Sequence, residues 1–141
     1  VDLEHERRLH ALLAEGVAAG FIVTAHDVSD GGLAVALAEC AIAGPERIGV
    51  DAVFADPLRP DALLFGESTG RIITASHDAG ALLALARRHG IAAYEVGRTG
   101  GARLVIRPPD GGVWIDADVA ELHAAWAGAL PRRLATSGER R

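Results

Sequence analysis

Apolar side chains recur at two spacings along the chain, and the spacing separates predicted helices from predicted strands. Apolar residues three or four positions apart form one face of a helix. This spacing predicts helices over 2–19 and 31–43, from a cap at Ser76, His77 or Asp78 to Arg88, and from Asp118 onward. In the last helix the residues expected on the inner face are Val119, Leu122, Trp126 and Leu130.

Alternating or β-branched apolar runs predict the strands. These runs are 21–25, 48–54, 63–65, 71–75, 91–96, 103–106 and 113–115. Residues 66–70 are expected to join two antiparallel strands, and the glycine-rich segment 97–101 is expected to be a hairpin turn. Hairpins produce antiparallel pairs, whereas helical crossovers allow parallel ones. The sequence therefore predicts an α+β fold with a mixed, largely antiparallel sheet.

Length and composition limit the class of protein. The 141 residues are expected to form one domain over 1–134, followed by a small, charged and disordered tail over 135–141. The net charge of −5, without clustered cations, argues against a nucleic-acid surface. No apolar run reaches the length of a membrane span and no signal-peptide pattern opens the chain, so a cytoplasmic protein is expected. Because Val1 already lies in a helical pattern, we expect a piece of a longer protein.

The densest group of polar residues follows the first predicted strand, in the segment AHDVSDGGLAVALAE. Its members are His26, Asp27, Ser29, Asp30, Gly31 and Gly32. The first amides of a helix are unpaired donors that attract a phosphate, and glycine allows a close approach. Asp27 and Asp30 would repel a bare anion, which leaves two interpretations open. Either Mg²⁺ bridges these carboxylates to a phosphate, or Ser29 and Asp30 cap the helix themselves.

A second candidate lies in the segment LLFGESTGRIITAS. Glu67, Ser68 and Arg71 could recognise a phosphorylated substrate, because a guanidinium can grip a phosphate with two hydrogen bonds. The alternative is a solvated Glu-Arg pair in a loop bracketed by glycines. The histidines do not form an H-x-x-x-H pair or a comparable ligand pair, and the single Cys40 is expected to be a small buried hydrophobe.

Four segments together carry a resemblance to a known family. They are, in order, AHDVSDGGLAVALAE, LLFGESTGRIITAS, VGRTGGARLVI and VAELHAAWAGALPRRL. They resemble the C-terminal domain of the phosphoribosylformylglycinamidine synthase family, in the superfamily related to aminoimidazole ribonucleotide synthetase. The resemblance implies a layered α/β/α domain. It also implies part of an ATP-dependent ligase that converts formylglycinamide ribonucleotide and glutamine-derived ammonia to formylglycinamidine ribonucleotide in purine biosynthesis.

The resemblance also implies cofactors, partners and residue roles. ATP and Mg²⁺ are the expected cofactors, and the partners are the remaining domains of the same chain and a glutamine amidotransferase. The turn from His26 to Gly32 is expected to face a nucleotide or phosphate, with Asp27 and Asp30 as the metal ligands. Glu67, Ser68 and Arg71 are expected to face substrate. Since the family's catalytic histidine lies in segments without a counterpart here, no catalytic residue is expected and the isolated domain should be inactive.

Two other interpretations remain open. The chain could be the C-terminal domain of another superfamily member, such as aminoimidazole ribonucleotide synthetase. It could also be a stand-alone, non-catalytic, ferredoxin-like module that binds a small molecule. A self-sufficient module is expected to be monomeric, whereas an excised domain is expected to expose an apolar face and to self-associate.

Overall fold

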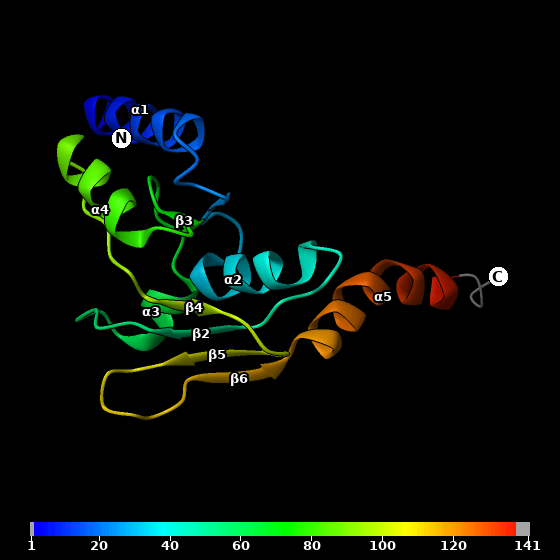
Figure 1. Ribbon diagram of the computed structural model, residues 1–141. Helices are drawn as coiled ribbons and strands as arrows, with labels where there is room; N and C mark the ends of the chain where they lie inside the picture. Colours follow the sequence, from blue (N-terminus) through cyan, green and yellow to red (C-terminus); the bar gives the residue numbers. More distant parts are fainter. Residues whose placement is uncertain (1, 138–141) are drawn as a thin grey trace. The chain divides into compact units, whose positions relative to one another are not determined.

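The computed structural model describes residues 2–137, which form helices and short strands in two compact units. The units comprise residues 1–36 with 57–96 and residues 37–56 with 97–141, and one helix continues from the first unit into the second. In chain order the elements are α1 (Leu3–Ala18), β1 (Thr24–Asp27), α2 (Gly32–Ala43), β2 (Val50–Val53), α3 (Pro60–Phe65), β3 (Ile72–Ala75), α4 (Ala79–Arg88), β4 (Gly97–Thr99), β5 (Arg103–Arg107), β6 (Ile115–Asp118) and α5 (Val119–Ser137) (Figure 1). The predicted α+β class is confirmed.

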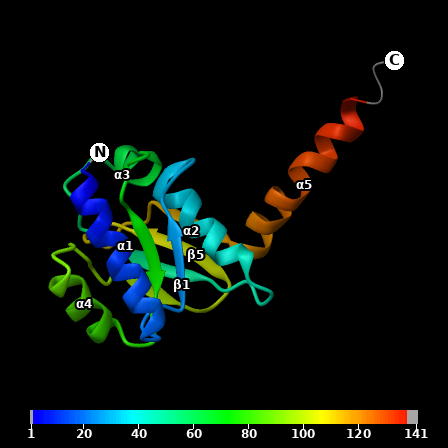
Figure 2. The same ribbon diagram turned by 90° about the horizontal axis from the view of Figure 1, so that it is seen from above.

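The first unit is built around a pair of antiparallel strands and a pair of helices. β1 and β3 pair antiparallel, with Thr24 opposite Ala75 and Asp27 opposite Ile72. Figure 2 shows α1 and α4 lying side by side, and buried residues from both helices and the segment after α4 form their shared core. This core consists of Leu9, Leu12, Leu85, Ala86 and Ile91.

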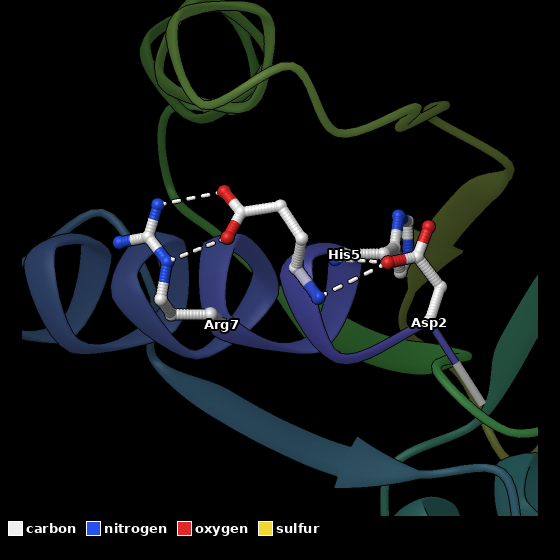
Figure 3. Close-up of polar contacts among 4 residues, drawn as sticks. Asp2, His5 and Arg7 are labelled. Atoms are coloured by element: carbon white, nitrogen blue, oxygen red, sulfur yellow. Dashed lines mark hydrogen bonds and ion pairs between the residues drawn. The ribbon is translucent and has the colours of Figure 1, made fainter.

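The start of α1 is fixed by its own polar side chains. The Asp2 carboxylate accepts hydrogen bonds of 3.0 Å from the amides of Glu4 and His5 (Figure 3). The His5 amide is the main reason that the pKa of Asp2 lies below its ordinary value. Arg7 pairs with Glu4 one turn away. A carboxylate in this position satisfies amides that the helix itself leaves unpaired, so the first turn of α1 is well defined.

An ion pair connects α1 to the end of α4 and gives a pH-dependent prediction. Glu15 Oε2 lies 2.8 Å from His89 Nε2, and Glu15 also pairs with Arg88. These contacts, that with His89 first, lower the pKa of the Glu15 carboxyl from its ordinary 4.5. The Glu15 carboxyl therefore binds a proton more readily in the unfolded chain than in the folded one. Its contribution to stability is complete above pH 4.5 and is lost as the pH falls through the lowered pKa.

We expect Glu15→Gln to lower Tm at pH 6 by no more than about 3 °C, because the pair is largely solvated. Thermal melts followed by circular dichroism between about pH 3 and pH 6 measure this difference, which should shrink toward the acid end. A constant difference across the range would show that the ionised carboxylate is not what stabilises this contact.

The second unit contains a four-stranded sheet in the order β4-β2-β5-β6. β2 and β5 run parallel, whereas the β2–β4 and β5–β6 pairs are antiparallel, as the sequence predicts for a mixed and largely antiparallel sheet. β5 lies at the centre of the hydrophobic core of the second unit, because its Leu104 and Ile106 side chains are 2% and 0% exposed. Burial of apolar surface at about 25 cal/mol per Å² makes this strand a main source of the unit's stability.

The predicted strand over 63–65 is wrong, because these residues form the second half of α3. Pro60 begins that helix, where its fixed φ is favourable and its missing N–H costs no helical bond. Leu63 and Leu64 are both buried on it. A short apolar run does not distinguish a strand from a helix, and the proline is a helix start here and not only a loop signal.

The predicted hairpin around residues 97–101 is also wrong. Residues 91–96 form no regular strand, and Gly97–Thr99 instead form β4, which pairs with β2 and not with β5. A Cβ at Gly97 would collide with the Asp51 carbonyl oxygen, so only glycine allows β4 to approach β2 this closely. β2 therefore lies between β4 and β5, and the segment after β4 is a crossover to the other side of β2.

The remaining differences concern element ends and the last helix. The strand predicted over 21–25 is shifted to 24–27, and that predicted over 113–115 is shifted to 115–118. Asp118 caps α5 by accepting hydrogen bonds from the amides of Ala120 and Glu121. Val119 is buried as predicted, but Trp126 and Leu130 are 64% and 67% exposed, so the expected inner face is wrong beyond the first turn.

The ends of the predicted domain stay a prediction. α5 continues to Ser137, and residues 138–141 of the predicted tail lie outside the described residues. In the described part of the chain, none of the helices combines the length and apolarity needed to span a membrane.

Candidate functional site

The pairing of β1 with β3 brings the two sequence-predicted segments together. Because the strands are antiparallel, the end of β1 lies beside the start of β3, and Asp27 is opposite Ile72. The Val28 amide extends this pairing by donating a 2.9 Å hydrogen bond to the Arg71 carbonyl. The turn after β1 and the loop before β3 therefore form one region of the first unit, although more than thirty residues separate them.

Two contacts hold the Glu67 loop against the start of α2. The Gly31 amide donates a 3.0 Å hydrogen bond to Glu67 Oε1, across 36 residues of sequence. At Gly32, whose φ is +75°, a Cβ would lie 2.6 Å from the Phe65 carbonyl carbon. Both glycines therefore allow the turn into α2 to contact the segment from Phe65 to Glu67. The carboxylate beside the positive end of α2 is that of Glu67 and not that of a ligand.

Over the described residues, the Ser29 and Asp30 side chains do not form the predicted caps of α2. The Ser29 carbonyl accepts from the Gly32 amide in a tight turn. Within residues 2–137, neither the Ser29 hydroxyl nor the Asp30 carboxylate bonds to an amide of α2, and the acceptor that reaches Gly31 comes from Glu67. Sequence spacing could not identify this cap, because the acceptor lies far along the chain.

A pocket of about 720 Å³ opens beside these contacts. Its lining consists of Glu6, Leu9, His10, Asp27, Val28, Ser29, Glu67, Ser68, Thr69, Gly70, Arg71 and Ile72. The structure thus unites five of the predicted site residues, which are Asp27, Ser29, Glu67, Ser68 and Arg71. The other predicted members, namely His26, Asp30, Gly31 and Gly32, are not in the lining.

Helix α1 adds residues that the sequence did not single out. Glu6 and His10 lie one turn apart on α1 and both line the pocket, beside buried Leu9. Their i, i+4 spacing is visible in the sequence, but nothing in it connects α1 to the turn after β1. Only the packing of α1 onto this unit places the two side chains here.

Arg71 is the cationic group best placed to bind an anion in the pocket. Its side chain is half-buried, and among the described residues it forms no ion pair. A guanidinium presents five donors in a plane and matches the oxygens of a phosphate. Three carboxylates, from Glu6, Asp27 and Glu67, line the same pocket, and that of Glu67 already accepts from Gly31. The site therefore offers a cation and carboxylates together, which suits a phosphate accompanied by a metal ion.

The other titratable candidates show no comparable arrangement. His26 Nδ1 lies 2.7 Å from the Asp27 carbonyl oxygen, which can only accept, so this nitrogen carries the proton. Burial, with a smaller effect of Glu39, raises the pKa of the Cys40 thiol, which agrees with a packing role and not a nucleophilic one. Over residues 2–137, no three histidine, cysteine or acidic side chains gather as a metal cluster.

Comparison with known families identifies the domain. Residues 1–107 match the family described as AIR synthase related protein, C-terminal domain. The chain belongs to this family. The match includes the turn after β1, the Glu67 loop and β5, and it ends before β6 and α5. The pocket of this AIR synthase-related domain is therefore formed entirely by residues within the family match.

Individual relatives cover almost the whole domain. It is 44% identical to phosphoribosylformylglycinamidine synthase subunit PurL of Thermomicrobium roseum over 136 residues, 92% of this chain, and 42% identical to that of Moorella thermoacetica over 93% of this chain. The chain spans only 18% of the length of either relative. The solved structure of Thermotoga maritima PurL complexed with ATP has a TM-score of 0.72 and 22% identity, covering 84% of this chain and 21% of that one. This structural likeness confirms the fold.

Proposed function

We propose that this AIR synthase-related domain is the C-terminal part of a phosphoribosylformylglycinamidine synthase. The observation that carries the proposal is the 44% identity to a PurL subunit across 92% of the chain. In this reaction an ATP-dependent ligase converts formylglycinamide ribonucleotide and ammonia to formylglycinamidine ribonucleotide. Both relatives are PurL subunits, which favours this enzyme over aminoimidazole ribonucleotide synthetase. This chain matches only 18% of the length of each relative, which favours part of an enzyme over a stand-alone module.

Partners and location follow from the same proposal. In the relatives, the four-fifths of the sequence that this chain does not match would supply the catalytic and ATP-binding domains. The domain alone is therefore expected to be inactive. Exposed Trp126, Leu130 and Leu134 on α5 are apolar groups that such neighbouring domains would cover. A glutamine amidotransferase is the proposed source of ammonia, supported by a solved PurLQS assembly of Thermotoga maritima, and the cytoplasm is the proposed location.

The pocket is the proposed ligand site of the domain. Arg71, Ser68 and Ser29 supply donors for the phosphate group of a nucleotide or ribonucleotide. The choice of these ligands is supported by solved PurL structures complexed with ATP and with FGAR. The residues fit Mg²⁺, which takes one or two protein carboxylates and completes its shell with phosphate oxygens and water. Asp27 would hold it from the pocket wall, whereas Asp30, the second ligand that the family resemblance implies, lies outside the pocket lining. When bound, Mg²⁺ would neutralise phosphate charge.

A test of the proposal uses the full-length enzyme that contains this domain. We expect it to form formylglycinamidine ribonucleotide from formylglycinamide ribonucleotide, ATP and ammonia, measured by product chromatography and ADP release. The same assay with formylglycinamidine ribonucleotide as the starting substrate detects aminoimidazole ribonucleotide synthetase activity. Turnover of only that second substrate would contradict the proposal and favour the other enzyme.

Substitution of the acidic turn gives a residue-level prediction. Asp27→Asn should raise the apparent dissociation constant for ATP with Mg²⁺ by about tenfold, because one charged ligand of the metal is lost. Asp30→Asn should have a smaller effect, since Asp30 is outside the pocket lining. Calorimetric titration measures both. Asp110→Asn is the control, because Asp110 bonds only locally, to the Gly112 amide. Unchanged affinity with a lower Tm would favour a structural role for Asp27.

A further inference from the structure

Glu67 is the one member of the pocket lining whose carboxylate bonds to the turn that leads into α2, at Gly31. The amides at the start of a helix carry partial positive charge, which a carboxylate at this position neutralises. The Gly31 amide, directly before α2, donates to Glu67 Oε1 at 3.0 Å, so a carboxylate of the chain itself already lies beside this positive end. A ligand anion at the same amide would have to displace Glu67, whereas a ligand bound beside Arg71 would not.

Backbone contacts also fix the two ends of the loop that carries Glu67. Before it, the Gly66 amide donates to the Ala62 carbonyl, and Phe65 lies against Gly32 so closely that a Cβ there would collide with its backbone. After it, the Arg71 carbonyl accepts from the Val28 amide. Between these fixed ends Ser68 and Thr69 are exposed, and the Glu67 contact is the hydrogen bond that ties the middle of the loop to another element.

We infer that Glu67 is a positioning residue that holds Ser68 and Arg71 in place for a phosphate-bearing ligand, and does not bind that ligand itself. The inference rests on the proposed function. The geometry of the pocket agrees with it, because Glu67 Oε1 is engaged by the Gly31 amide, which leaves Arg71 as the loop's cationic group for a ligand phosphate. The phosphate belongs either to the nucleotide or to the ribonucleotide substrate.

Two variants of the full-length enzyme separate positioning from direct binding. Glu67→Gln keeps a side-chain oxygen that accepts from Gly31, whereas Glu67→Ala removes the acceptor. Hydrogen exchange measured by mass spectrometry on peptides covering 28–34 reports the Gly31 bond. Calorimetric titrations with ATP plus Mg²⁺ and, separately, with formylglycinamide ribonucleotide report the ligand. Glu46→Ala is the matched control, because Glu46 is an exposed glutamate outside the pocket lining.

For Glu67→Ala we expect faster exchange in 28–34 and about tenfold weaker binding of one of the two ligands, which identifies the source of the phosphate. Glu67→Gln should restore both readouts to near the unsubstituted values. Binding weakened equally by glutamine and alanine would overturn the inference, because the charge would then act on the ligand directly. Unchanged exchange in the alanine variant would also overturn it. If the unsubstituted enzyme bound neither ligand, the proposed function would fail, while the exchange comparison would still decide whether Glu67 holds Gly31.

Discussion

Replacing Gly32 with alanine is expected to destabilise the first unit by about 3 kcal/mol. The residue has φ +75°, and a left-handed conformation costs a residue with a Cβ about 1–2 kcal/mol. The new Cβ would also lie 2.6 Å from the Phe65 carbonyl carbon and 2.9 Å from the Leu64 carbonyl oxygen. These are backbone atoms that cannot rotate away, so α3 or the start of α2 must shift. Chemical denaturation followed by circular dichroism measures the loss.

Gly20 provides the matched control for this change. It has the same φ of +75°, but a Cβ there would meet nothing within 4 Å. Gly20→Ala should therefore show only the conformational cost of about 1–2 kcal/mol. The difference between the two variants isolates the collision with Phe65. Equal losses would show that α3 does not approach Gly32 as the structure has it, and the arrangement of the pocket would need revision.

Truncation of the central strand of the second unit is expected to be comparably severe. Ile106→Ala should reduce the free energy of unfolding by roughly 2–5 kcal/mol, because the side chain is 0% exposed and its removal leaves a cavity in addition to the lost transfer energy. β5 is paired on both sides, with β2 and with β6, so the strand cannot move freely to fill the space. Denaturant unfolding followed by tryptophan fluorescence and circular dichroism checks the value.

Val53→Ala is the comparison for the buried strand. Val53 lies at the end of β2, opposite Arg107, and is 44% exposed. Its truncation should cost less than about 1 kcal/mol, since little apolar area returns to water. A similar loss at both positions would mean that β5 is not at the centre of this core.

Four of the five helices in the described part of the chain were predictable from the sequence, whereas α3 and the pairing of the strands were not. Helical spacing in α1, α2 and α4 reflects which face packs inward, and this pattern is local. Strand pairing depends on residues far apart in the chain. The segment 63–65 was misassigned because the hairpin interpretation supplied a nearby partner for β3, whereas the actual partner is β1.

The candidate site shows the same division. The polar turn and the Glu67 loop were found by their residues, and the family match includes both. Which of their members share a pocket was not predictable, because the sequence does not show that Asp27 and Ser29 line it while Asp30, Gly31 and Gly32 do not. Glu6 and His10 were missed, since no local signal connects α1 with that turn.

The sequence by itself determined the class of fold, the family and the two segments that form the candidate site, because these depend on residue identity and local spacing. The tertiary structure decided that β1 and β3 lie together, that the side chain bonded at the turn into α2 is that of Glu67 and not of Ser29 or Asp30, and that α1 completes the pocket. Each of these is a contact between residues distant in sequence. Such contacts are chosen by the packing and hydrogen bonding of the whole unit, to which the local pattern of polar and apolar residues contributes only one part.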